Sequence, residues 1–132
     1  MASLARYSLV FYAPPAAVAA CKAAVFRAGA GRYPGPGNYT ECCWSAAGTG
    51  QFRPGDAANP HIGSVGALEE TPEVRVETLC VGSDVARKAV EALKSYVSLL
   101  LTSVAAEGGS SVCPSAHPYE EPAYQVHKLE DF

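Results

Sequence analysis

The sequence has little charge of either sign and no long hydrophobic run. Charged residues make up 17% of its 132 residues, and the formal net charge is −3. A nucleic acid or an anionic membrane surface calls for clustered lysine and arginine, whereas the 10 basic residues here are scattered. No apolar run approaches the roughly 20 residues that span a bilayer. The composition therefore predicts a protein with no nucleic-acid partner and no membrane segment.

The sequence also lacks a paired-cysteine motif and a secretory leader. Its 5 cysteines form an odd set without a CxxC pair, which favours reduced thiols over a disulfide framework. Residues 1–6 are too short and too polar to act as a secretory signal before the first strand. With 48% hydrophobic residues, the chain can bury one core, so we expect a single soluble, cytoplasmic domain over residues 1–132.

Hydrophobic patterns predict four strands and two helices. The strands are expected at residues 7–12, 38–47, 74–79 and 123–129, and the helices at 16–28 and from 83 to about 106. Pro14 and Pro15 would open the first helix, Gly29 would close it, and Ser83 would cap the second. Residues 48–66 are predicted to form a long loop rich in glycine and proline. A loop of this length in a small domain more often has a functional or interfacial role than none.

Two successive strand–helix–strand units are typical of one fold, the ferredoxin-like split βαβ sandwich. In this α+β fold, two helices cover one face of an antiparallel sheet. The opposite face must stay polar or find a partner. The aromatic residues that could occupy it are Tyr39, Trp44, Phe52 and Tyr124. So much aromatic character beside a small sheet predicts an oligomer.

Several motifs follow one another along the chain. They are Gly29–Arg32, Gly37–Tyr39 with Cys42 and Trp44, Gly48–Pro54, Asn59–Gly63 with Val65–Glu69, and His117–Tyr124. From about Ala5 to Asp131, this series resembles the insert domain of the Nif-three-like proteins, a dinuclear-metal family labelled GTP cyclohydrolase I type-two homologues. It is especially similar to short stand-alone versions of that insert. The resemblance implies a PII-like and CutA-like fold and trimer-forming relatives.

The chain departs from the family pattern in ways that limit this inference. The resemblance implies that the metal ligands of full-length members lie in halves that flank the insert. Those halves are absent from this sequence, so neither the metal site nor a cyclohydrolase activity carries over. The chain also adds a segment from Ser95 to Ser115, whose role the sequence does not identify. His61 stands where relatives more often have an aromatic residue.

The last motif suggests a metal site. His117 and Glu120, with Glu121 and His61, could supply nitrogen and oxygen ligands to a divalent ion. No two histidines share helical i,i+4 spacing, however, and we favour a structural role for His117 in the turn before the last strand. A divalent metal is thus a candidate cofactor, without an identified ligand set.

The glycine-rich segment Gly48–Pro54 suggests an anion site. Gly48 and Gly50 could let backbone N–H groups bend around an anion, with Arg53 as a further donor. The segment lacks the Lys-Ser/Thr ending of a phosphate-binding P-loop. The alternative is a hairpin in which the glycines adopt positive φ and Arg53 pairs with a carboxylate such as Glu69 or Glu77. Both interpretations stay open.

The cysteines are expected to be structural. Cys42 and Cys43 would point to opposite faces of a strand and could not chelate one ion together. The apolar surroundings of Cys21 and Cys80 predict core positions. The spacing identifies neither a base nor an orienting group for a cysteine nucleophile, so no catalytic residue is predicted.

The sequence favours a non-catalytic module of PII/CutA-like type that self-associates, as a trimer, and binds a small anion, metabolite or metal near subunit boundaries. The residues expected to bind the ligand are Gly48, Gly50, Arg53, His61, His117 and Glu120. The alternative is a metal-dependent, hydrolase-like enzyme in which the same histidine and glutamate residues hold the ion. A third hypothesis is a purely structural partner of another protein.

Overall fold

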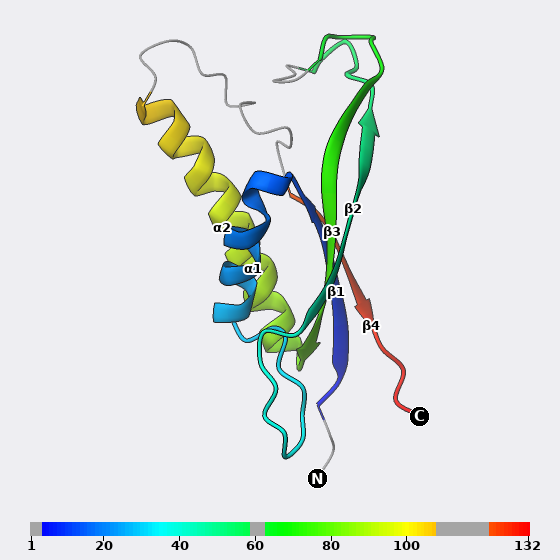
Figure 1. The fold of residues 1–132 in the computed structure, drawn as a ribbon, viewed down its shortest axis with the longest axis vertical. Coiled ribbons are helices and arrows are strands. Elements are labelled where there is room, and N and C mark those ends of the chain that lie inside the picture. The colour runs from blue at the N-terminus through cyan, green and yellow to red at the C-terminus, as the bar shows by residue number, and fades with distance from the viewer. Residues whose placement is uncertain (1–3, 59–62, 108–121) are drawn as a thin grey trace.

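The computed structural model describes residues 4–58, 63–107 and 122–132 (Figure 1). Its elements, in chain order, are β1 (Arg6–Ala13), the 3-10 turn η1 (Pro15–Ala17), α1 (Val18–Arg27), β2 (Cys43–Phe52), β3 (Glu69–Val81), α2 (Ser83–Glu107) and β4 (Ala123–Lys128). This order of strands and helices is the one predicted from the sequence.

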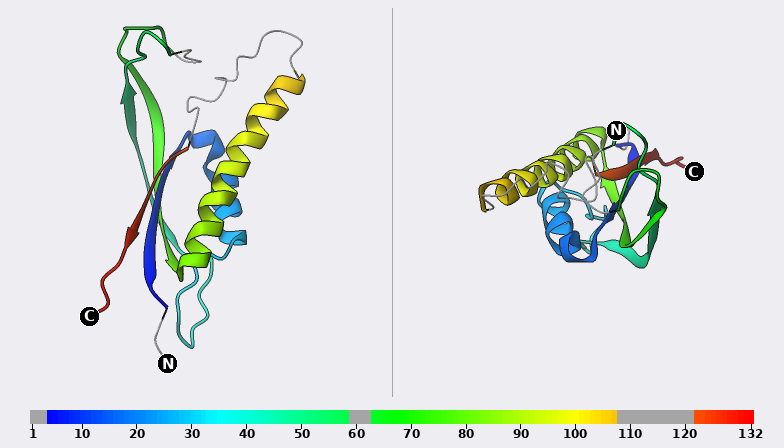
Figure 2. Two further views of the ribbon diagram at one scale, coloured as in Figure 1. Left: turned by 180° about the vertical axis from the view of Figure 1, so that it is seen from behind. Right: turned by 90° about the horizontal axis from the view of Figure 1, so that it is seen from above.

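The strands form one sheet, and both helices cover the same face of it (Figure 2). The strand order is β2-β3-β1-β4, and every neighbouring pair is antiparallel. β1 and β3 therefore occupy the centre, while β2 and β4 form the edges. This is the predicted ferredoxin-like α+β fold, with two strand–helix–strand units interleaved in one sheet.

The hydrophobic core lies between the sheet and the helices. Alternate residues of a strand point to opposite faces, so one set of side chains from β1 and β3 faces α1 and α2. The fully buried members of this core are Leu9, Phe11, Val25, Ala30, Val76, Cys80 and Ala89. Leu93, on the predicted apolar stripe of α2, is 1% exposed and joins them. The predicted core positions of Cys21 and Cys80 are confirmed, because both thiols are buried.

The helix ends follow backbone chemistry. Pro15 lies in the first turn that leads into α1, and Gly29 follows α1 with a φ of +113°, as predicted for a residue that closes a helix. The cap of α2 differs by one residue from the prediction. The Ala86 N–H donates to the Gly82 carbonyl at 3.2 Å, so Gly82 occupies the cap and Ser83 begins the helix.

The second strand lies 5 residues later than predicted at each end, since β2 covers Cys43–Phe52 rather than residues 38–47. β3 is also longer than expected and begins at Glu69. Residues 48–52 pair with residues 69–73, whereas β1 stops at the Ala13–Val74 pair. Residues 48–66 were predicted as one long loop because of their glycine content. Residues 48–52 instead belong to a hairpin that extends past the centre of the sheet (Figure 1).

The long helix α2 accounts for the first part of the added segment. It runs to Glu107, so residues 95–107 of the Ser95–Ser115 segment are helical. Residues 108–115 lie outside the described residues, as do the side chains of Val97, Leu100 and Val104. Over the described part of the chain, no helix combines the length and the hydrophobicity needed to cross a bilayer.

Candidate functional site

One face of the sheet, which we call the open face, carries no helix (Figure 2). The strand registers place side chains of all four strands on it, among them Ser8, Val10 and Tyr12 on β1, Trp44 and Ala46 on β2, Arg75, Glu77 and Leu79 on β3, and Ala123, Gln125 and His127 on β4. The open face therefore mixes charged, aromatic and aliphatic side chains. Only its apolar part would gain from burial against a partner.

A polar network crosses the middle of the open face. The Arg75 guanidinium donates to a Glu77 carboxylate oxygen at 3.0 Å, and the Ser8 hydroxyl lies 3.3 Å from the other oxygen. The hydrogen bond from Arg75 to Tyr12, followed by the contact with Glu77, raises the pKa of Arg75 above its usual value. The guanidinium also lies 5.9 Å from the centroid of the Trp44 ring. The network fixes the Glu77 carboxylate beside an aromatic ring.

The open face is unevenly exposed. Trp44 has 57% of its surface exposed, which is unusual for the one tryptophan of the chain. Val10, at the centre of the same face, is only 2% exposed, and its neighbours across the strands are Glu77 and Gln125. The long polar side chains thus shield the centre, and Trp44 stands out at the β2 side.

A cavity of about 370 Å³ lies at one end of the open face. Ser8, Trp44 and Glu77 contribute from the strands, and Tyr33 and Leu129 contribute from segments outside them. The remaining lining residues are Cys42, Cys43, Thr78 and Leu79. The cavity offers the Glu77 carboxylate, the Ser8 hydroxyl and the rings of Tyr33 and Trp44, a lining suited to a small molecule with both polar and flat apolar parts.

The backbone before β2 holds Cys42 at this cavity. The Cys42 N–H donates to the Gly31 carbonyl at 2.9 Å, and the Cys42 carbonyl accepts from the Thr78 hydroxyl at 2.8 Å. Cys42 is half-buried and Cys43 is exposed. Cys42 precedes β2 rather than lying within it, and both cysteines are among the residues that line the cavity. That the two thiols cannot bind one ion together stays a prediction.

Gly48 and Gly50 lie on β2, in the hairpin that extends past the sheet centre. Neither has positive φ, so the hypothesis that they are required for that conformation is wrong. A Cβ at Gly50 would overlap the far end of the Glu73 side chain, which can move aside, so crowding does not require glycine there. A Cβ at Gly48 would meet no atom within 4 Å.

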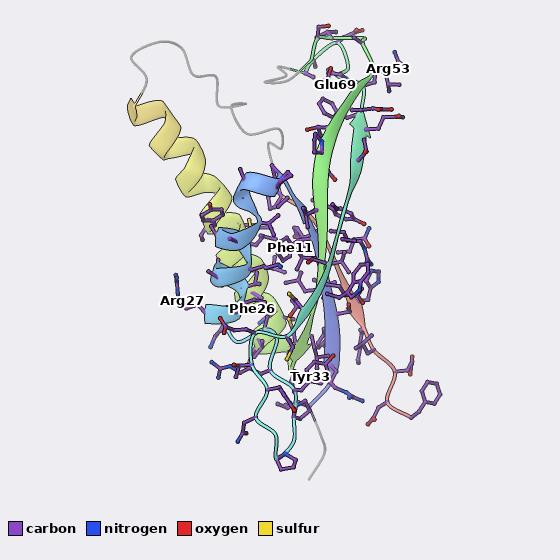
Figure 3. The ribbon with its side chains drawn as sticks, viewed as in Figure 1. Phe11, Phe26, Arg27, Tyr33, Arg53 and Glu69 are labelled. Atoms are coloured by element: carbon purple, nitrogen blue, oxygen red, sulfur yellow. The ribbon has the colours of Figure 1, made fainter. Side chains whose placement is uncertain are left out.

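Arg53, directly after β2, closes the loop of the hairpin (Figure 3). Its guanidinium donates to the Gly66 carbonyl at 2.7 Å, and the Gly66 N–H donates to the Pro54 carbonyl at 2.8 Å. Glu77, one of the two carboxylates proposed as its partner, binds Arg75 instead. The Arg53 guanidinium therefore binds a backbone carbonyl, a type of partner that the sequence could not reveal.

The predicted residues His61, His117 and Glu120 lie outside the described residues. The structure consequently does not test whether they approach Arg53 or one another. Within the described ranges, no group of three or more histidine, cysteine, aspartate or glutamate residues is arranged to hold a metal ion. His127, the one described histidine, lies on the open face with a ring nitrogen 3.1 Å from the Gln125 side-chain oxygen.

Two of the four aromatic residues expected on the open face are there. Trp44 and Phe52 share its side of β2. Tyr39 instead lies exposed in the loop between α1 and β2. Tyr124 packs against the core on the helix-covered side, with the Lys94 ammonium 5.4 Å from its ring centroid. A one-residue shift in register would reverse these faces, so aromatic content alone could not assign them.

Comparison with known proteins identifies the family. No family model matches the chain. The GTP cyclohydrolase 1 type 2 homologue of Mycobacterium leprae is 42% identical over 129 residues, which cover 98% of this chain and 27% of the relative. The homologue of Bacillus subtilis is 37% identical over 122 residues, which cover 92% of this chain and 26% of the relative. The crystal structure of a Bacillus cereus protein related to NIF3 superposes with a TM-score of 0.69 at 28% identity, covering 99% of this chain and 27% of that one.

The chain spans about a quarter of the length of the curated relatives it matches, as their shares of 27% and 26% show. The resemblance to the NIF3 family carried by the sequence motifs is thereby confirmed. The chain also superposes on the Bacillus subtilis GlnK–ATP complex with a TM-score of 0.52 at 10% identity, which supports a PII-like fold.

Proposed function

We propose that this NIF3-type domain is a non-catalytic binding module that self-associates, as a trimer, through its open face. It binds a small anion, metabolite or metal at the boundary between subunits. The observation that supports this function is the exposed Trp44 beside a cavity of about 370 Å³, on the sheet face that carries no helix.

The exposed part of Trp44 favours self-association. An aromatic side chain buries about 150–250 Å² when fully covered, so covering the exposed 57% of Trp44 is worth about 2–4 kcal/mol per subunit at ~25 cal/mol per Å². Arg75 and Glu77 already neutralise each other at 3.0 Å, so a second copy could cover the face without burying an unpaired charge. Phe52 extends the same face along the hairpin.

The cavity supplies the ligand site. It opens beside Trp44, so a second subunit packed against that ring would also close the cavity mouth. Glu77 and Ser8 would orient polar groups of the ligand, while Tyr33 and Trp44 would contact a flat apolar part. GlnK was solved as a complex with ATP, which makes nucleotides reasonable first metabolites to screen. The hairpin residues Gly48, Gly50 and Arg53 would approach the ligand from a neighbouring subunit.

Native mass spectrometry of gently purified protein, with elemental analysis of the same sample, tests both parts of this function. We expect a trimer that carries a stoichiometric small molecule or metal. Trp44→Glu and Phe52→Asp should give folded monomers, as judged by circular dichroism. Leu68→Glu is the matched control, because Leu68 is 49% exposed in a loop away from the open face, and it should stay trimeric.

A trimer that survives both open-face substitutions would contradict the proposed interface. A wild-type monomer without bound ligand would remove the subunit-boundary site altogether. No observation on the described residues favours the metal-dependent hydrolase. A metal-dependent reaction that is lost in His117→Ala would nevertheless contradict a non-catalytic role, and the same purified sample can be assayed for it.

A further inference from the structure

A second surface, on the helix-covered side of the sheet, has the features of a peptide-binding site. A cavity of about 410 Å³ runs between α2 and the edge strand β4, and we call it the α2–β4 groove. Its apolar lining consists of Tyr7, Val90, Tyr124 and Val126, with Ala86. Val126 is 40% exposed although it points toward the helix layer, so the groove is open to solvent there.

In the sheet formed by the described residues, β4 pairs with β1 alone, so a specific set of its backbone groups points to the outer edge. The Leu129 N–H donates to the Arg6 carbonyl at 2.9 Å, so Arg6 and Leu129 form a hydrogen-bonded pair. In an antiparallel ladder, such pairs alternate along the strand. With the observed register, residues 123, 125 and 127 therefore bond to β1. The N–H and C=O groups of Tyr124, Val126 and Lys128 point away from β1, toward the outer edge of the sheet.

The residues that line the groove are also the ones whose backbone groups point outward. Tyr124 and Val126 line the groove with their side chains and direct their backbone groups to the free edge of β4. An extended segment that paired with this edge would place alternate side chains in the groove, between β4 and α2. An exposed strand edge next to an apolar groove is thus arranged to accept a strand rather than a compact small molecule.

The charges at the groove indicate the chemistry of that strand. Arg87 and Lys94 on α2 line it, and Lys128 ends β4 with its side chain on the same face. Glu91 is the only carboxylate among the described lining residues. Positive charge therefore dominates along the groove, which favours a partner that carries carboxylates near its apolar side chains.

A second copy of this chain does not supply such a strand. The two edge strands of the sheet are β2, with the sequence CWSAAGTGQF, and β4, with the sequence AYQVHK. Neither contains an aspartate or a glutamate, and β4 would bring Lys128 toward the same cationic groove. The carboxylates of Glu130 and Asp131 lie beyond β4, and that of Asp131 is 3.9 Å from the Arg6 guanidinium. The two strand edges of a second copy therefore lack carboxylates of their own, and charge complementarity favours a segment of another protein.

We propose that the α2–β4 groove binds an extended, acidic peptide segment of a partner protein, which adds as a strand to the free edge of β4. Apolar side chains at alternate positions of the segment enter the groove between Val90 and Val126. Carboxylates beside them pair with Arg87 and Lys94. This site is separate from the open face and does not depend on the proposed self-association.

Fluorescence anisotropy with synthetic ten-residue peptides tests this site. The probe is a labelled peptide of alternating valine and glutamate, and the comparison peptides have lysine in place of glutamate or N-methyl groups on alternate backbone nitrogens. We expect binding of the first peptide only. Charge reversal in Arg87→Glu/Lys94→Glu should weaken it at least about ten-fold, since two close charge pairs are lost. The control Arg27→Glu/Lys88→Glu makes the same change in net charge away from the groove and should bind normally.

Val126→Pro provides an independent test of strand pairing. It removes the outward N–H of an edge strand without removing a hydrogen bond to β1, so the fold should persist while peptide binding is lost. Trp44→Glu should bind the peptide normally, which separates this site from the open-face interface. Equal binding by the two charge-reversed variants, unchanged binding of the N-methylated peptide, or no binding at millimolar peptide would each overturn the proposal. So would a change in oligomeric mass in Arg87→Glu/Lys94→Glu without peptide binding, which would identify a second copy as the occupant.

Discussion

Gly31 joins three parts of the fold and should tolerate no side chain. Its N–H donates to the Leu79 carbonyl of β3 at 2.7 Å, and its carbonyl accepts from the Cys42 N–H at 2.9 Å. The segment after α1 is thereby fixed both to the central strand and to the start of β2. Gly31→Ala should therefore disturb the fold and the cavity at Cys42 together.

The cost of Gly31→Ala can be estimated from two terms. The φ of Gly31 is +81°, and an L-residue in this region costs about 1–2 kcal/mol. The added Cβ would lie 2.8 Å from the Cys42 nitrogen and 3.0 Å from the Cys42 carbonyl oxygen, both backbone atoms that are held by hydrogen bonds. Crowding of this kind costs about 1–3 kcal/mol. We expect a total loss of about 2–5 kcal/mol, a large part of the roughly 5–15 kcal/mol that stabilises a typical domain.

Urea unfolding at neutral pH measures this loss against a matched control. Gly66 has the same φ, +81°, but a Cβ there would meet no atom within 4 Å. Gly66→Ala therefore carries the conformational cost without the crowding, and it should be destabilised by about 1–2 kcal/mol. If Gly31→Ala loses no more stability than Gly66→Ala, the close approach of Cys42 does not constrain this position, and the reasoning is refuted.

Two further predictions concern the core. Leu93→Ala should lower the free energy of unfolding by about 2–5 kcal/mol, because Leu93 is 1% exposed, and an effect within ~0.5 kcal/mol would contradict its assignment to the core. Burial raises the pKa of Cys21 and of Cys80 from 9.0 to about 11. Above pH 9 the unfolded chain loses these protons first, so stability should fall from about pH 9 to pH 11. A Cys21→Ser/Cys80→Ser variant should lack this part of the decline in urea unfolding followed against pH.

Local sequence patterns were sufficient to predict the elements whose hydrophobic pattern is continuous along the chain. The strand at residues 7–12, the helix closed by Gly29 and the strand from Ala123 all agree with the structure to within two residues. The limits of β2 could not be predicted in this way. Gly48 and Gly50 indicate a loop by composition, but their pairing with Glu73 and Thr71 on β3 makes them strand. Pairing between strands is a tertiary property, and it outweighs local preference on an exposed edge.

The candidate site was harder to predict than the fold. Its cavity combines Tyr33, Trp44, Glu77 and Leu129, which come from four separate segments of the chain. No spacing in the sequence links them. The partner of Arg53 was missed for a related reason, because a backbone carbonyl leaves no trace in residue identity. Sequence motifs identified the family, whereas the arrangement of these side chains needed the fold.

Successive side chains of β4 point to opposite faces of the sheet. The open face and the α2–β4 groove could therefore each bind a partner at the same time. Residues 123, 125 and 127 direct their side chains to the open face and their backbone groups to β1, so a subunit on that face would take no hydrogen bond from the edge. Tyr124, Val126 and Lys128 direct their side chains to the helix layer and their backbone groups outward. A strand added at the edge would therefore use residues that self-association leaves free. Because the two sets share one rigid strand, a partner peptide would be presented at a fixed position on each subunit of the oligomer.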